Sequence, residues 1–306
     1  MKRKYLIGFL GISLATILAS CGNNTKTTSN TNTTGAEKTT TVTTTNYIEP
    51  TVYTVTSTLT VATTVEDGFT FDEANSKLII NKSGEYTITG SLNGSIECAS
   101  TLLEKVTLIL DGATITSDDA AITWLSEKSK VEIKAKKDTT NFLVTNASLV
   151  NETSTVVSNN NVEFGGKGTL NITNSHKHAV SASEVIIKGE VELNVTAAIK
   201  DGIHAKQIDI LSGNITITAT KDAIEAEVNS KGNKGTFTMT GGTLTIKDSA
   251  VGIKAQTSIT FADPTDTDPI GISLNMDNVS LAMDSEDITN TSLNLSYKVN
   301  GESSTI

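Results

Sequence analysis

The feature that most constrains this chain is internal repetition between residues 168 and 261. Four segments align there, with lengths of 22, 23, 29 and 19 residues. Every segment contains a short stretch of alternating apolar residues, then a compact five-residue motif, then a second alternating stretch. The segments are 168–189, 191–213, 214–242 and 243–261. Repeats of this length predict stacked structural units rather than one irregular globule.

The five-residue motif fixes which side chains share a face. Its copies begin 23, 21 and 29 residues apart, at His178, Asp201, Asp222 and Val251. Successive side chains of a strand point to opposite faces. We therefore expect the third and fifth positions, such as Ile203 and Ala205, to point inward. The fourth positions should point outward, and they are Ser181, His204, Glu225 and Lys254.

Three short strands in each repeat predict an all-β fold, a right-handed parallel β-helix whose coils stack about 4.8 Å apart. An antiparallel β-sandwich is the competing fold, but columns that stay in phase over four segments favour the solenoid. Aromatic residues are only 4% of the chain, so its core must consist mainly of aliphatic side chains. The three prolines lie outside the repeats, as stacked inner strands require. They are Pro50, Pro264 and Pro269.

The N-terminus predicts a lipoprotein. Residues 1–20 combine a basic start with a short apolar run, which is typical of a signal peptide, and Leu18-Ala-Ser-Cys21 resembles a bacterial lipobox. We expect lipidation of Cys21 and an extracytoplasmic protein whose only membrane attachment is the lipid. An ordinary secretory signal is the alternative. Residues 21–65 are rich in Thr, Asn and Ser and predict a disordered tether, and residues 66–306 would form the β-helix. A first strand near Val52–Val61 is the alternative for the end of the tether.

Charge limits the range of partners. The formal net charge is -10, and Arg3 is the only arginine. This composition disfavours nucleic acid as a partner. It also disfavours direct contact with anionic lipid. An anionic polymer remains possible where a divalent cation bridges the charges.

Cys98 lies in an alternating stretch and is expected to be a small buried side chain.

A candidate metal site follows from the first motif column. Asp201 and Asp222 should lie about 5 Å apart on neighbouring coils. Two carboxylates that close repel each other unless a proton or a cation lies between them, and Glu225 adds further negative charge. Calcium prefers such oxygen ligands. The alternative is that each aspartate caps its own turn. The histidines give only weak support for zinc, and exposed side chains are the simpler expectation for them.

Five sequence elements together resemble the family of secreted bacterial carbohydrate-binding domain-containing lipoproteins, of the clostridial type that binds polygalacturonate or cellulose. They extend from about residue 80 to residue 261 and are Gly84-Glu-Tyr-Thr-Ile-Thr-Gly-Ser-Leu, Val106-Thr-Leu-Ile-Leu-Asp-Gly-Ala-Thr-Ile, Lys167-Gly-Thr-Leu-Asn-Ile, Asp201-Gly-Ile-His-Ala and Asp222-Ala-Ile-Glu-Ala-Glu. The resemblance implies a right-handed β-helix, carbohydrate binding and calcium. The last repeat, Val251-Gly-Ile-Lys-Ala-Gln, lacks the acidic residues that the family often has there.

These observations predict a surface protein that binds an acidic polysaccharide such as polygalacturonate, with calcium as the cofactor. The candidate metal ligands are Asp201, Asp222 and Glu225. The candidate sugar-binding residues are His204, Lys206, Lys221, Lys231 and Lys234. The last two lysines belong to an insertion, residues 227–235, which should protrude as a loop beside the column of acidic residues.

Catalysis is not expected. A pectate-lyase mechanism with an arginine base would need an arginine in the mature chain, and Arg3 lies in the signal peptide. A glycosidase needs two separately placed carboxyl groups, and no second pair is apparent. A structural or adhesive spacer is the alternative function, and a polysaccharide lyase that uses a lysine base is a less favoured one.

Overall fold

The computed structural model describes residues 48–306 apart from 147–152, 198, 229–233 and 266–269. Every regular element among these residues is a β-strand. No helix in this part of the chain has the length and apolar character needed to cross a membrane. The signal peptide, Cys21, Lys231 and most of the expected tether lie outside the described residues.

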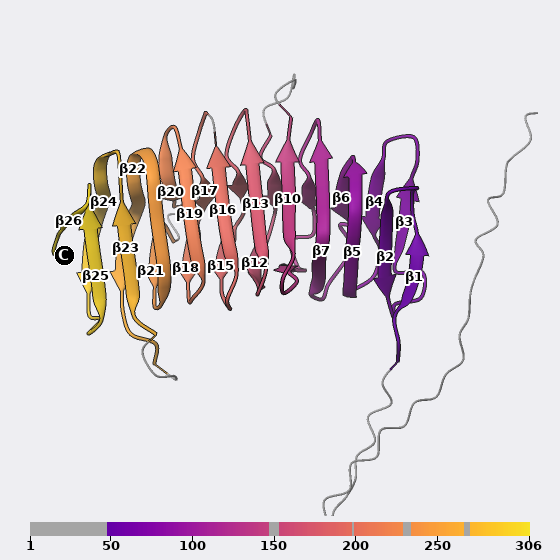
Figure 1. Cartoon of the computed structure of the whole chain (residues 1–306), viewed down its shortest axis with the longest axis horizontal. Helices are drawn as coiled ribbons and strands as arrows, with labels where there is room; N and C mark the ends of the chain where they lie inside the picture. Colours follow the sequence, from indigo (N-terminus) through magenta and orange to yellow (C-terminus); the bar gives the residue numbers. More distant parts are fainter. Residues whose placement is uncertain (1–47, 147–152, 198, 229–233, 266–269) are drawn as a thin grey trace, which may run out of the picture. The chain divides into compact units, whose positions relative to one another are not determined.

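The strands form a parallel β-helix of about eight turns, which confirms the predicted fold. Figure 1 shows the coils side by side, in sequence order from indigo to yellow. Three sheets of parallel strands surround one mainly aliphatic core, and we call these sheets faces A, B and C. Face A contains β10 (Thr140–Thr145), β13 (Thr169–Asn174), β16 (Glu192–Ala197), β19 (Asn214–Ala219), β23 (Ile272–Met276) and β25 (Leu295–Val299).

Face B carries the five-residue motifs, and face C follows it in each coil. Face B contains β4 (Lys77–Ile80), β6 (Ser95–Cys98), β8 (Ile122–Trp124), β11 (Val156–Ser158), β14 (Val180–Ser181), β17 (Ile203–Ala205) and β20 (Asp222–Ala226). Face C contains β9 (Val131–Ala135), β12 (Asn161–Gly166), β15 (Glu184–Ile187), β18 (Gln207–Ile210) and β21 (Thr236–Met239).

Four longer strands bend from one face into another, and short antiparallel strands pair at the two ends of the stack. The long strands are β5 (Gly84–Asn93), β7 (Val106–Ser117), β22 (Gly242–Phe261) and β24 (Val279–Asn290). At the N-terminal end β1 (Thr51–Thr54) pairs with β2 (Leu59–Thr63), and β3 (Phe69–Asp72) pairs with β4. At the other end β26 (Glu302–Ser303) pairs with β25.

The fold begins before residue 66, where the sequence placed the end of the tether. Strand β2 pairs with β5, and its Leu59 and Val61 are fully buried in the core. The Thr-rich composition of this segment conceals a short apolar alternation. Because burial of those two side chains compensates for the cost of ordering the segment, it belongs to the solenoid.

The predicted columns are in register. Ile203 pairs with Ile224, which pairs with Ile253, and all three side chains are fully buried. The coil corners need glycine where the backbone turns with positive φ. At Gly166, with φ of 101°, an added Cβ would lie 2.0 Å from the carbonyl oxygen of Ala135 on the preceding coil. Only glycine therefore fits this corner.

Candidate functional site

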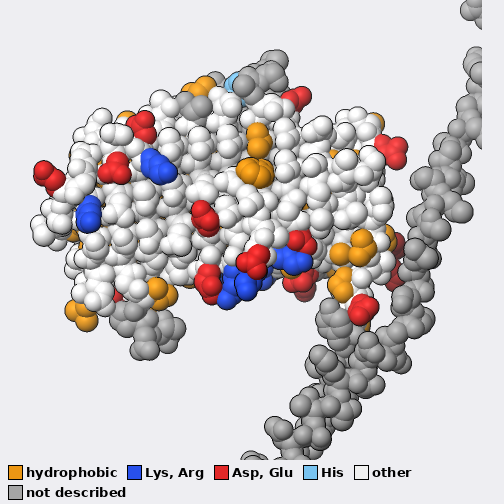
Figure 2. Space-filling view, viewed as in Figure 1, with side chains coloured by type: hydrophobic (Ala, Val, Ile, Leu, Met, Phe, Trp, Pro, Cys, Tyr) orange, Lys and Arg blue, Asp and Glu red, His pale blue; other side chains and the backbone are white. Residues whose placement is uncertain are grey.

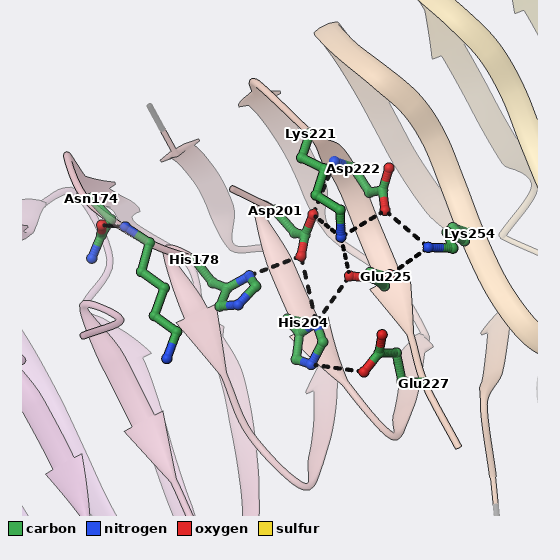
Figure 3. Close-up of polar contacts among 10 residues, drawn as sticks. Asn174, His178, Asp201, His204, Lys221, Asp222, Glu225, Glu227 and Lys254 are labelled. Atoms are coloured by element: carbon green, nitrogen blue, oxygen red, sulfur yellow. Dashed lines mark hydrogen bonds and ion pairs between the residues drawn. The ribbon is translucent and has the colours of Figure 1, made fainter. Parts of the chain in front are cut away.

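Seven polar side chains meet on face B, and we call them the face B cluster. They come from four successive coils: the turn before β14, then β17, β20 and the middle of β22 (Figure 3). The members are His178, Asp201, His204, Lys221, Asp222, Glu225 and Lys254. Figure 3 shows three carboxylates at the centre and the cationic side chains around them.

Asp201 is the most buried member and connects two coils. Its Oδ1 accepts a hydrogen bond of 3.0 Å from the backbone N–H of Asp222. Its Oδ2 lies 2.9 Å from Nδ1 of His178 and 3.5 Å from Nδ1 of His204. Burial alone would raise the pKa of Asp201, but the histidine contacts outweigh it and hold that pKa well below its usual value. Asp201 thus caps the next coil, whereas the sequence alternative was a cap on its own turn.

Glu225 departs from the expected exposure. Its register partners are His204 and Lys254, so its side chain leaves the strand on the outer side, as predicted. Only 1% of the residue is exposed, because the longer side chains around it cover it. Its Oε1 lies 2.7 Å from Nζ of Lys254, and its Oε2 lies 2.9 Å from Nζ of Lys221. Burial opposes ionisation, but these contacts lower the pKa of Glu225.

Asp222 is the least satisfied carboxylate of the cluster. It is 2% exposed, and its Oδ2 accepts no hydrogen bond from any of the described residues. The nearest ammonium groups, those of Lys221 and Lys254, lie 3.5 and 3.6 Å away. Burial raises the pKa of Asp222, and the two lysines only partly oppose this effect. A buried carboxylate oxygen in this state can accept a further ligand.

The histidines are not exposed side chains, so that expectation is wrong. His178 is 8% exposed, and its ring stacks on the ring of His204 at 4.5 Å between centroids. The buried Asn174 orders the turn before His178, because its Oδ1 accepts the backbone N–H groups of His176 and Lys177. Burial would lower the pKa of His204, yet the carboxylates of Asp201 and Glu225 raise it to about 9.

Two of the remaining predicted sugar-binding residues lie elsewhere. Nζ of Lys206 is 3.4 Å from Oγ of Ser183, and Nζ of Lys234 is 3.7 Å from a carboxylate oxygen of Glu184. Both lysines therefore border face C, and within the described part of the chain neither forms an ion pair with the face B cluster. The repeat pattern predicts that Lys254 points outward but does not assign it to the site. Its place in the fourth column, next to Glu225, was the signal that could have identified it.

The carboxylates of the cluster could bind a metal cation, but the ammonium group of Lys221 already contacts the same oxygens. Carboxylate oxygens of Asp201, Asp222 and Glu225 lie within 4.8 Å of one another, and all three residues are buried. This donor set fits calcium, which favours several carboxylate oxygens. Nζ of Lys221 lies 3.4, 3.5 and 2.9 Å from oxygens of the same three groups. The lysine thus supplies positive charge where the sequence argument required a cation.

Comparison with known proteins identifies the family of the chain. A family model described as "Carbohydrate-binding domain-containing protein" matches residues 74–294. The match covers more than half of the chain, so the protein belongs to this family. No curated protein matches it.

A solved structure shares the fold. It is described as "Structure of the polysaccharide lyase-like protein from C. thermocellum, Gadolinium derivative". Its sequence is 25% identical to this chain, and the TM-score is 0.61. The similarity covers 78% of this chain and 95% of that chain.

Proposed function

We propose that the protein is a non-catalytic binder of acidic polysaccharide and that the face B cluster is its binding site. One observation carries this proposal. Three cationic side chains, those of His204, Lys221 and Lys254, stand on successive coils above buried carboxylates that hold them in place. Membership of a carbohydrate-binding family supports a carbohydrate as the ligand.

The repeat explains why a polymer suits this surface. Strands on one face repeat at about 4.8 Å, so cationic groups recur along the solenoid at the scale of single sugar units. A uronate polymer carries a carboxylate on every residue. Weak contacts on successive coils therefore add through effective concentration, and the protein should prefer long chains to monomers.

The lysines of the cluster are unsuited to catalysis. A lyase needs a base that can lose its proton near the working pH. Burial opposes the charge on Lys221, but contacts with Glu225, Asp201 and Asp222 outweigh it and raise its pKa. The contact with Glu225 likewise raises the pKa of Lys254. Both groups stay protonated, which suits them to binding a carboxylate and not to removing a proton.

Calcium belongs to the proposal as the cofactor. Asp201, Asp222 and Glu225 would hold the ion, and the ion would offer free coordination positions to a uronate carboxylate. Lys221 competes for the same oxygens, and its side chain is 49% exposed. Calcium should therefore bind more tightly to Lys221→Met than to the wild type, and it should raise the thermal melting temperature of both. Equal melting curves in calcium and in EDTA for both proteins would contradict this part.

Attachment to the outer face of a membrane is the second part of the proposal. The lipobox-like Leu18-Ala-Ser-Cys21 and the Thr-rich stretch after it support a lipid anchor with a spacer. The folded part would then stand away from the bilayer, where it can reach extracellular polymers.

A structural spacer is the second candidate function. Its support is the pairing inside the face B cluster, where every carboxylate lies within 4.0 Å of at least one cationic group. An ion-pair network of this kind can simply tie four coils together.

Affinity electrophoresis in polygalacturonate gels separates these functions. We expect the wild type to be retarded, and Lys221→Ala/Lys254→Ala to be retarded several-fold less. The control Lys137→Ala changes a lysine outside the cluster that is 72% exposed, and it should behave as the wild type. Absorbance of unsaturated uronate should not grow. Growing absorbance would make the protein a lyase, and a wild type that is not retarded would favour the spacer.

A further inference from the structure

A second charged cluster lies on face C, and nothing in the proposed site uses it. Two glutamates on adjacent strands are its centre: Glu132 on β9 and Glu163 on β12, which are register partners and are 3% and 4% exposed. Four lysines surround them, and we call the six residues the lysine cage. The lysines are Lys105, Lys130, Lys134 and Lys188. Figure 2 shows basic and acidic side chains gathered along the lower edge of the molecule in this view.

The contacts hold both carboxylates firmly in the charged state. Glu132 lies 2.8 Å from Nζ of Lys105 and 3.2 Å from Nζ of Lys134. Glu163 lies 2.7 Å from Nζ of Lys130 and 2.8 Å from Nζ of Lys188. Burial alone would raise the pKa of Glu132, but the lysine contacts lower it to about 2.

The cage holds more positive than negative charge. Four ammonium groups face two carboxylates, which leaves a surplus of two positive charges on a chain whose formal net charge is -10. Among the described residues, these lysines form their ion pairs with these two glutamates. Their side chains are 37–45% exposed, so each ammonium keeps N–H groups that point to solvent.

The cage and the face B cluster follow one another along the solenoid. The cage occupies the coils of β7, β9, β12 and β15, and the cluster continues from the coil of β14 and β15 to that of β22. Lys206 and Lys234 lie on the border of face C, in the coils of β18 and β21 that the face B cluster also occupies. Positive side chains therefore extend over six coil steps of about 4.8 Å each.

We infer that the lysine cage is a second subsite, which binds anionic groups of the same polysaccharide chain as the face B cluster. The inference rests on the proposed function, because it assumes an acidic polymer as the ligand. A polysaccharide that crosses the edge between faces B and C would contact both groups. Binding at one group then raises the effective concentration of the polysaccharide at the other. The buried glutamates act as positioning residues that keep the four ammonium groups on one patch.

The test removes the surplus charge and leaves both glutamates paired. In Lys130→Gln/Lys134→Gln, Lys105 and Lys188 still contact both carboxylates, so the fold should survive. The control Lys137→Gln/Lys298→Gln changes the net charge equally at exposed positions outside the cage. We expect the cage variant to bind polygalacturonate about fivefold more weakly than the control, with an unchanged melting temperature.

Two outcomes separate this inference from the proposed function. If the Lys221→Ala/Lys254→Ala protein loses affinity while the cage variant equals its control, the cage is not a subsite and the face B cluster stands. If the cage variant loses affinity and the face B variant does not, the cage is the site and the assignment of face B is wrong. A wild type that is not retarded by any acidic polymer overturns both.

Discussion

Protonation of His204 should make stability depend on pH in a narrow window. Its pKa is about 9 in the folded protein, against 6.5 for the ordinary side chain, because Asp201 and Glu225 outweigh the effect of burial. A raised pKa means that the folded state binds the proton more tightly than the unfolded state does. The stabilisation is therefore complete below pH 6.5 and is lost as the pH rises through 9.

The difference between the two pKa values sets the size of the effect. It corresponds to at most about 3 kcal/mol of unfolding free energy, since one pKa unit is worth about 1.4 kcal/mol. Urea denaturation at pH values from 6 to 9.5 measures this loss. In His204→Gln the same loss should be absent, whereas in His176→Gln, outside the cluster, it should remain. Parallel curves of unfolding free energy against pH for the wild type and His204→Gln would refute the reasoning.

Three further predictions concern other parts of the chain. Gly166→Ala should destabilise the fold by more than about 1 kcal/mol in urea denaturation, because its Cβ would lie 2.0 Å from a carbonyl oxygen; unchanged stability would contradict the corner geometry. The thiol of Cys98 is 2% exposed and burial raises its pKa, so it should react with a thiol reagent only after unfolding, and rapid labelling of the native protein would count against this. Cys21→Ser should move the protein out of the membrane fraction, and retention after a carbonate wash would exclude the lipid anchor.

Much of the fold could be predicted from the sequence because the repeat has a physical basis. Stacked coils require aliphatic residues in fixed columns, and Ile203, Ile224 and Ile253 stand in one such column. The start of the fold was harder to place. Leu59 and Val61 provide only two apolar positions in a Thr-rich stretch, which is too short an alternation to indicate a strand by itself.

The position of the face B cluster was predictable from the sequence, but its charge balance was not. Register alone brings Asp201, Asp222 and Glu225 together, as expected. The sequence could not show that Lys221 folds back over these carboxylates, because the direction of a long side chain depends on what surrounds it in space. The burial of His178 followed from the same cause, since the stacked ring of His204 covers it.

The lysine cage was not predicted from the sequence, although part of its pattern is visible there. Glu132 and Lys134 occupy outer positions of β9, and Lys130 directly precedes this strand in the same alternation. What could not be read was the pairing with Glu163, because 31 residues and a full coil separate the two strands.

The most direct test of the proposed site uses the histidines as internal probes. Nuclear magnetic resonance of the imidazole nitrogens would follow His178 and His204 during a titration with oligogalacturonate in calcium. The buried indole of Trp124, which donates to the carbonyl oxygen of Ser129, serves as the reference. Binding at the face B cluster predicts saturable shifts of both imidazole signals and an unchanged indole signal. Saturable binding that leaves both histidine signals in place would contradict the account.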